Sequence, residues 1–380
     1  MAAATYSELF NHVVIDRIIS TVRSPNHRLS QIYGLQPGGS AVSDIGGEVF
    51  GWDIFDRTRK MSSGRLRNSG PATRKPNLVG TKTATVYRQY EQIPIEGDRI
   101  FRKRKLGGPI GALDVRGQEY ITKQIGYQHE KFMNTREALT AFCFQGGFDL
   151  LLDGDDIMPV PVGSGDYNVD FGLPASNQGA VPHGGKDTFA GNWQDAVNCD
   201  PIGEFITLNK VAVKGSRYPI QLCWLDAEGA QYLLKSEAVN THTGTANVIT
   251  NEGQHITWES NNPERQLSNV LTFHLRGYPM IQFIVYDDEV LLDDGTAVPF
   301  IPPGKGLFTP APSSEWIEWR NGSELVQERL QGPIREAYGM TMWLEPNRHP
   351  VSLSLVALDN GLPTPYVPQA WFWADLYTPA

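Results

Sequence analysis

The sequence predicts an α+β fold, and three features of its 380 residues support that class. Runs rich in β-branched and aromatic residues, at positions 49–55 and 83–95, are typical of strands. Residues 114–144 contain no proline and place apolar side chains at helical spacing, which predicts one long helix. From residue 211 onward, short strand-like and helix-like segments follow one another, so helices and strands are both expected in the second half.

The composition indicates a folded protein that is rich in turns, because 40% of the residues are hydrophobic and 20% are charged, with 38 Gly and 26 Pro. The three cysteines, Cys143, Cys199 and Cys223, form no CxxC pair, which favours a reducing compartment over a disulfide framework or a zinc site. Charged residues interrupt the first 20 positions, and no apolar run could span a bilayer. We therefore expect a protein that folds inside the cell and does not associate with a membrane.

The charge of the chain is divided unevenly. Residues 57–105 hold 14 basic and three acidic residues, a local net charge of +11, whereas the whole chain carries −9. The rest of the chain therefore carries −20. Such a segment is typical of a nucleic-acid-binding arm, but it also fits an extension that docks on the acidic body of another copy. A solvated loop that is basic by chance is the third interpretation.

The most basic part of this segment, residues 57–82, lies between the two strand-like runs and contains no acidic residue. A connection of this length is far too long for a tight hairpin turn, and loops of this size are usually functional or disordered. The pattern predicts a two-stranded ribbon with a long basic tip. Because an isolated ribbon is marginally stable in water, it needs a partner surface.

The long helix predicted at 114–144 would measure about 45 Å at ~1.5 Å per residue. It ends before Gly146-Gly147. The other expected elements follow from the same patterns: a helix at 7–19, a hairpin at 149–173, a helix beginning at Asp200-Pro201, a strand at 219–225, a helix at 226–236, a strand at 281–286, a turn at Asp294-Gly295, and terminal strands at 351–358 and 366–376.

No standard catalytic signature is present, since the sequence lacks a GxxxxGK[ST] phosphate loop, a GxSxG nucleophile elbow and an HExxH motif. The eight histidines show no metal-ligand spacing, and the acidic clusters near Asp153 and Asp287 coincide with predicted turns. We therefore expect no catalytic residue, no cofactor and no bound metal ion.

A basic ribbon, then a very long helix, then a hairpin and a mixed domain whose terminal strands return is an unusual order. Short motifs accompany it: Gly47-Glu48-Val49, Arg102-Lys103-Arg104-Lys105, the helix body 119–144 with Leu-Thr-Ala-Phe before Gly146-Gly147, Cys223-Trp-Leu-Asp-Ala-Glu-Gly229, Phe283-Ile-Val-Tyr286, and Asp294-Gly295 leading to Phe300-Ile-Pro-Pro-Gly304. In this order the chain resembles the major capsid proteins of tailed phages, most closely the lambda-type major capsid protein E group.

The resemblance implies the Hong Kong phage-type capsid fold. Its expected parts are an N-terminal arm (1–46), an extended loop (47–95), a peripheral domain (96–202) with a spine helix (114–144), an axial domain (203–345), and C-terminal strands that return to the core (346–380). The resemblance gives no ground for a covalent crosslink between subunits.

The implied function is a major capsid protein that assembles as hexamers and pentamers into an icosahedral shell, first a procapsid and then a mature head. The shell would enclose the double-stranded DNA of a tailed phage, and it would form in the bacterial cytoplasm and end in the virion. Implied partners are further copies of the chain, a scaffolding protein, a portal protein and a decoration protein. Packaged DNA would be contacted only non-specifically, because the acidic remainder of the chain repels it.

Within this implied assembly, the basic segment is expected to contact a neighbouring subunit. The expected contact residues are Arg57, Arg59, Lys60, Arg65, Arg67, Arg74, Lys75 and Lys82. The expected acidic partners on the spine helix of the neighbour are Glu119, Glu130 and Glu137.

Three other functions fit parts of the sequence. An encapsulin-type compartment would share the fold but enclose cargo enzymes, and neighbouring genes for a terminase and a portal would exclude it. A nucleic-acid-binding protein could use residues 57–105 as its arm, and it would show salt-dependent DNA affinity. A glycan-active enzyme could use the Trp and Asp clusters, and it would hydrolyse a polysaccharide.

Overall fold

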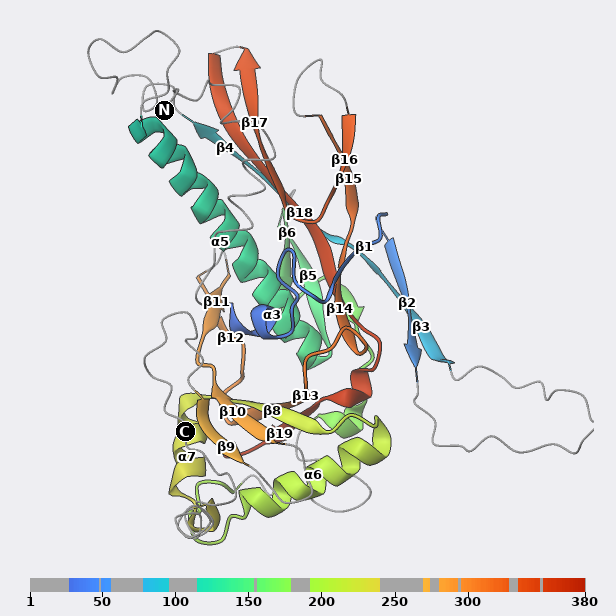
Figure 1. The fold of residues 1–380 in the computed structure, drawn as a ribbon, viewed down its shortest axis with the longest axis vertical. Coiled ribbons are helices and arrows are strands. Elements are labelled where there is room, and N and C mark those ends of the chain that lie inside the picture. The colour runs from blue at the N-terminus through green and yellow to red at the C-terminus, as the bar shows by residue number, and fades with distance from the viewer. Residues whose placement is uncertain are drawn as a thin grey trace, which may run out of the picture. The chain divides into compact units, whose positions relative to one another are not determined.

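The computed structural model of the chain (Figure 1) describes residues 27–47, 49–55, 78–95, 115–153, 156–178, 192–239, 269–273, 280–292, 295–327, 334–348 and 351–379. The chain forms two compact units, each built from separate segments. Unit 1 comprises Met1–Phe50, Ala84–Thr140 and Glu318–Thr364, and unit 2 comprises Gly51–Thr83, Ala141–Ile317 and Pro365–Ala380. No helix among the described residues is long and apolar enough to cross a membrane.

Unit 1 is organised on a five-stranded sheet. Strands β1 (Val42–Asp44), β14 (Ile317–Asn321), β18 (Val351–Pro365) and β17 (Thr341–Arg348) lie side by side in this order, and β4 (Tyr87–Ile95) also pairs with β18. β18 pairs in antiparallel fashion with both β17 and β4. The long β18 strand is therefore the centre of this sheet.

Helix α5 (Val115–Gln145) confirms the long helix predicted at 114–144. Its length follows from the absence of proline, and its end follows from Gly146, whose φ of +102° is a backbone conformation that glycine adopts at little cost. In unit 1 the helix packs along the sheet (Figure 1), and the buried contacts join Ile121, Ile125 and Phe132 of α5 to Ile95, Met342, Leu355 and Ala357 of the strands.

A two-stranded ribbon, β15 (Ser323–Gln327) with β16 (Ile334–Tyr338), also belongs to unit 1. Val326 and Ala337 are buried, and they pack against a cluster formed by Trp343, Val356 and Leu358 of the main sheet. No strand is predicted here from the sequence, because neither short run has a strong alternation.

Unit 2 contains a second five-stranded sheet in the order β19 (Phe372–Asp375), β13 (Lys305–Pro310), β8 (Ile220–Leu225), β10 (Ile281–Val285) and β9 (Asn269–Phe273). β8 and β10 are parallel, and the other neighbours are antiparallel. The strands predicted near β8, β10 and β19 are confirmed, whereas β9 and β13 were missed.

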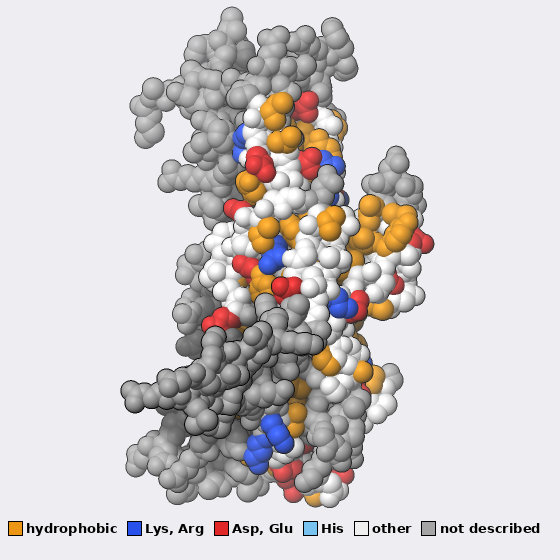
Figure 2. Space-filling model, turned by 90° about the vertical axis from the view of Figure 1, so that its right-hand side faces the viewer, with side chains coloured by type: hydrophobic (Ala, Val, Ile, Leu, Met, Phe, Trp, Pro, Cys, Tyr) orange, Lys and Arg blue, Asp and Glu red, His pale blue; other side chains and the backbone are white. Residues whose placement is uncertain are grey.

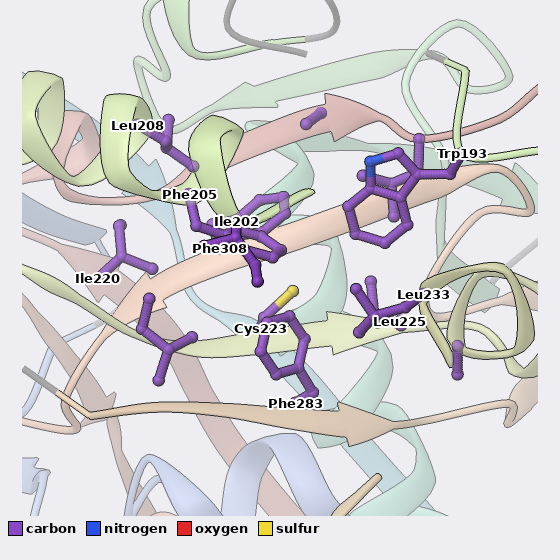
Figure 3. Packing of buried hydrophobic residues seen from close by; sticks show 14 of the residues in the cluster. Trp193, Ile202, Phe205, Leu208, Ile220, Cys223, Leu225, Leu233, Phe283 and Phe308 are labelled. Carbon is purple, nitrogen blue, oxygen red and sulfur yellow. The ribbon is translucent and has the colours of Figure 1, made fainter. Parts of the chain in front are cut away.

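Two helices cover this sheet, α6 (Pro201–Gly215) and α7 (Ala227–Lys235). Each begins at an aspartate whose side chain accepts a backbone N–H: Asp200 from Gly203 at 3.0 Å, and Asp226 from Gly229 at 2.9 Å. Figure 3 shows the core between α6 and the strands. There the Phe205 ring lies 4.9 Å from that of Phe283 and 5.4 Å from that of Phe308.

The predicted hairpin after the long helix is confirmed as a three-stranded sheet, β6 (Asp156–Val160), β5 (Gly147–Asp153) and β7 (Tyr167–Asp170). The Asp149 carboxylate organises the loop between β6 and β7 by accepting the N–H groups of Gly163, Ser164 and Gly165 at 2.5–3.2 Å.

Short elements complete unit 2. Strands β11 (Glu289–Leu291) and β12 (Ala297–Pro299) flank the predicted turn at Gly295, and two 3-10 helices are formed by Ala175–Asn177 and Pro368–Ala370.

One predicted strand was wrong in its extent. The single strand expected at 83–95 is two strands, because β3 (Leu78–Thr85) pairs with β2 (Val49–Phe55) whereas β4 pairs with β18. The break falls at Val86. The strand propensities of these residues could not reveal the break, because its position depends on the partner strand with which each part pairs.

Other predicted boundaries met different outcomes. The N-terminal arm expected at 1–46 contains the short helix α3 (Arg28–Ile32). Residues 318–345, assigned to the axial domain, pack in unit 1 with α5. The helix predicted at 7–19 lies outside the described residues. The division into arm, loop, peripheral domain and axial domain otherwise stays a prediction.

Candidate subunit interface

The basic segment is connected to a ribbon, β2 with β3, whose base is well packed in unit 2. Trp52 and Ile54 alternate along β2 with more exposed neighbours, and both side chains are buried. The Trp52 ring lies 5.9 Å from the Phe171 ring, and the Thr81 hydroxyl of β3 donates a 2.8 Å hydrogen bond to Asp53 of β2. The residues on either side of the basic segment are therefore fixed.

Lys82 is held within its own subunit. Its Nζ lies 2.6 Å from Oδ2 of Asp170, and Oδ1 of Asp170 accepts the N–H of Gly172 at 2.7 Å. Burial alone would raise the pKa of Asp170, but the hydrogen bonds from Lys82 and Gly172 outweigh it and lower that pKa below its usual value. Lys82 thus stabilises the base of the ribbon through Asp170, the last residue of β7.

The other basic residues assigned to the subunit contact lie outside the described part of the chain. They are Arg57, Arg59, Lys60, Arg65, Arg67, Arg74 and Lys75. Their role as contact residues stays a prediction.

The three acidic residues assigned to the spine helix differ in exposure. Glu119 and Glu130 are exposed on α5, whereas Glu137 is fully buried. The two carboxylate oxygens of Glu137 accept the backbone N–H groups of Leu29 and Ser30, at 2.6 and 2.8 Å. Its carboxylate is already used at the N-terminal end of α3, so it is not available to a neighbouring subunit in this conformation.

A buried ion pair lies one residue before Glu137. The Arg136 guanidinium donates two hydrogen bonds of 2.6 Å to the Asp359 carboxylate, and both side chains are at most 1% exposed. A third hydrogen bond of 3.3 Å reaches the carbonyl oxygen of Leu35, and the guanidinium lies 4.5 Å from the Trp319 ring centre. Arg136 thus joins α5, β18, β14 and the segment after α3.

Residues 27–44 are held by two further contacts in unit 1. The His27 ring is 2.5 Å from the side-chain oxygen of Asn134, and β1 pairs in parallel with β14. His129 lies in this buried environment. Burial, followed by the nearby His27 and Arg136, lowers the pKa of His129 to about 4, and Asp359 opposes this shift only in part. Residues 27–44 are thus integrated into unit 1.

Comparison with known families shows to which class of protein the chain belongs. The sequence profile of the family described as phage major capsid protein E matches residues 58–374. The chain belongs to the phage major capsid protein E family. This capsid protein is a non-enzymatic structural subunit of the icosahedral shell of a tailed phage, and its location is the virion capsid. The prediction made from the order of elements is confirmed.

Solved structures support the fold of the capsid protein. A prophage protein of Escherichia coli CFT073 that is assigned to the capsid is 12% identical, with a TM-score of 0.53 over 99% of this chain and 100% of that one. A phage-related protein of Bordetella bronchiseptica RB50 is 10% identical, with a TM-score of 0.50 over the whole of both chains. At these identities the likeness concerns the fold alone, the Hong Kong phage-type capsid fold. No curated protein matches the chain.

Sequence reasoning missed the Arg136–Asp359 pair and the buried role of Glu137 in the capsid protein. A signal was present, because Arg136 follows Phe132 by four residues and precedes Leu139 by three. This spacing places a charge on the apolar face of the helix. A charge in that position requires a buried partner, but the sequence does not say that the partner is Asp359.

Proposed function

We propose that residues 57–82 of the capsid protein form a clasp that holds a neighbouring subunit in the shell. The supporting observation is that this stretch has eight basic and no acidic residues and begins and ends on a packed ribbon. In a closed shell each subunit contacts several copies through different surfaces. A basic extension of an otherwise acidic chain is attracted to any of those copies.

Glu119 and Glu130 of the neighbouring α5 helix are the acidic partners that this proposal retains. Both are exposed. They lie 11 residues apart, which is about three helical turns, so they share one face at a separation of roughly 16 Å. This spacing suits a segment that carries several Lys and Arg residues.

The proposal extends to the partners beyond the shell itself. A scaffolding protein would set the size of a procapsid, a portal protein would give the DNA one entrance, and a decoration protein would cover the mature head. The acidic surplus outside residues 57–105 supports only non-specific contact with the packaged DNA.

Charge reversal tests the clasp. The variant Arg65→Glu/Arg67→Glu/Arg74→Glu is expected to fold and yet to form no shells, because attraction to the acidic neighbour becomes repulsion. Electron microscopy counts the shells, and circular dichroism checks the fold. A matched control, Lys210→Glu/Lys214→Glu/Lys235→Glu, changes the net charge equally on exposed positions of α6 and α7 and should still assemble. Normal shells from the first variant would refute the clasp.

A further inference from the structure

The outer face of the β15–β16 ribbon is exposed and apolar. In the register of the two strands, Ser323 lies opposite Tyr338, Leu325 opposite Glu336, and Gln327 opposite Ile334. Residues that lie opposite in an antiparallel pair point to the same face. Leu325 is 72% exposed, Ile334 65% and Tyr338 38%, so three large hydrophobic side chains of one face are open to solvent.

The opposite face of this ribbon is already occupied. Val326 and Ala337 are buried against Trp343, Val356 and Leu358, so the outer residues cannot be the ones that attach the ribbon to unit 1. Exposed apolar patches of this kind mark interaction sites. Figure 2 shows, on the side that it draws, hydrophobic side chains gathered in groups with charged side chains between them.

The apolar face continues into the segment before β2. The N–H groups of Ile45 and Gly46 donate to the carbonyl oxygen of Asn321, at 3.2 and 3.4 Å, and the N–H of Gly47 donates to Ser323 at the start of β15. Ile45 is 49% exposed. The patch is therefore formed by Leu325, Ile334 and Tyr338, with the exposed Ile45 in the adjoining segment.

Among the described residues, the charges on the outer face of the ribbon and in the adjoining segment are negative. Glu336 lies on the outer face, and its hydrogen bond to the Tyr338 hydroxyl, together with burial and the nearby Asp44, raises the pKa of that tyrosine. Glu324 points to the inner face, where it pairs with Arg88 at 2.9 Å. Two copies of this face would bring Glu336 and Asp44 against the same residues, and this repulsion disfavours self-pairing.

We propose that this face receives the basic segment 57–82 of a second copy of the chain in the shell. The segment offers eight basic and no acidic residues to Glu336 and Asp44, and its Met61, Leu66 and two prolines offer apolar side chains to Leu325 and Ile334. This inference rests on the clasp proposal, and it places the clasp on the ribbon in addition to the exposed carboxylates of α5.

Site-specific photo-crosslinking tests the location. A photoreactive amino acid replaces Leu325, and this variant is assembled with an excess of wild-type chain so that shells form. We expect crosslinks between subunits that mass spectrometry maps to residues 56–82. The same amino acid at Val197, which is 64% exposed in unit 2, serves as the control and should give no crosslink to that segment. Crosslinks from position 325 to other segments only, or none, would overturn the inference.

A charge exchange separates the inference from the clasp proposal. Glu336→Lys should reduce the yield of shells several-fold, and adding Arg65→Glu/Arg67→Glu/Arg74→Glu to it should give more shells than that triple variant alone. If the triple variant loses assembly while Glu336→Lys assembles normally and gives no recovery, the clasp stands and its proposed site on the ribbon is wrong. If the triple variant assembles normally, the clasp itself is wrong.

Discussion

At the residue scale, Arg136 shows how one side chain connects distant parts of unit 1. Its three hydrogen bonds reach β18 and the segment after α3, and its guanidinium covers the Trp319 ring of β14. A buried pair of this kind adds little stability compared with an apolar replacement, but it is costly to break from one side. Its contribution is therefore mainly to fix which segments meet.

Removing one member of the pair should be more damaging than removing both. Arg136→Met leaves the Asp359 carboxylate buried without its partner, and a loss of about 3–5 kcal/mol in the free energy of unfolding is expected. Arg136→Met/Asp359→Leu should lose clearly less. Urea unfolding followed by tryptophan fluorescence measures both variants. A double variant as unstable as the sum of the single ones would contradict this account.

His129 should make the protein sensitive to acid. Its pKa is about 4 in the folded chain and about 6.5 in an unfolded one. Between these values the unfolded state binds the proton more readily, so this residue lowers the stability as the pH falls from about 6.5 to 4, by about 3 kcal/mol in all. His129→Gln should flatten the unfolding free energy across this window. An unchanged slope in the variant would argue against the assignment.

At the element scale, the long helix, the hairpin after it and most of the unit 2 strands could be predicted, because their patterns are local. The β15–β16 ribbon could not be, because neither of its short runs has a strong alternation. The break at Val86 could not be either, because β4 pairs with β18, which lies far away in sequence. The features of the candidate interface also differ in whether the sequence alone could predict them. The charge of residues 57–82 is plain in the sequence, whereas the burial of Glu137 depends on Leu29 and Ser30, more than 100 positions earlier.

Helix α3 should loosen when Glu137 is removed. Glu137→Ala leaves the N–H groups of Leu29 and Ser30 without their acceptor, which costs about 1–3 kcal/mol locally. Hydrogen–deuterium exchange should become roughly ten-fold or more faster at these two amides. Glu130→Ala, on the exposed side of the same helix, should leave the exchange unchanged. Equal protection in both variants would show that the carboxylate does not hold this segment.

At the scale of the whole molecule, the parts of the capsid protein that stabilise its fold differ from the parts that are proposed to contact other subunits. Its two units each have a core of their own, and the described apolar surface that lacks a partner within the chain includes the outer face of β15 and β16. The basic segment and this face have opposite charges and complementary apolar character. In the proposed shell contact they meet, whereas the folding of a single subunit does not require that contact.

A cryo-electron microscopy map of shells assembled from this chain would show directly where residues 57–82 lie. We expect closed shells of uniform diameter, in which residues 57–82 of each subunit lie against an acidic surface of a neighbouring one. Shells in which that segment lies over its own subunit, or extends into the interior toward DNA, would contradict this expectation.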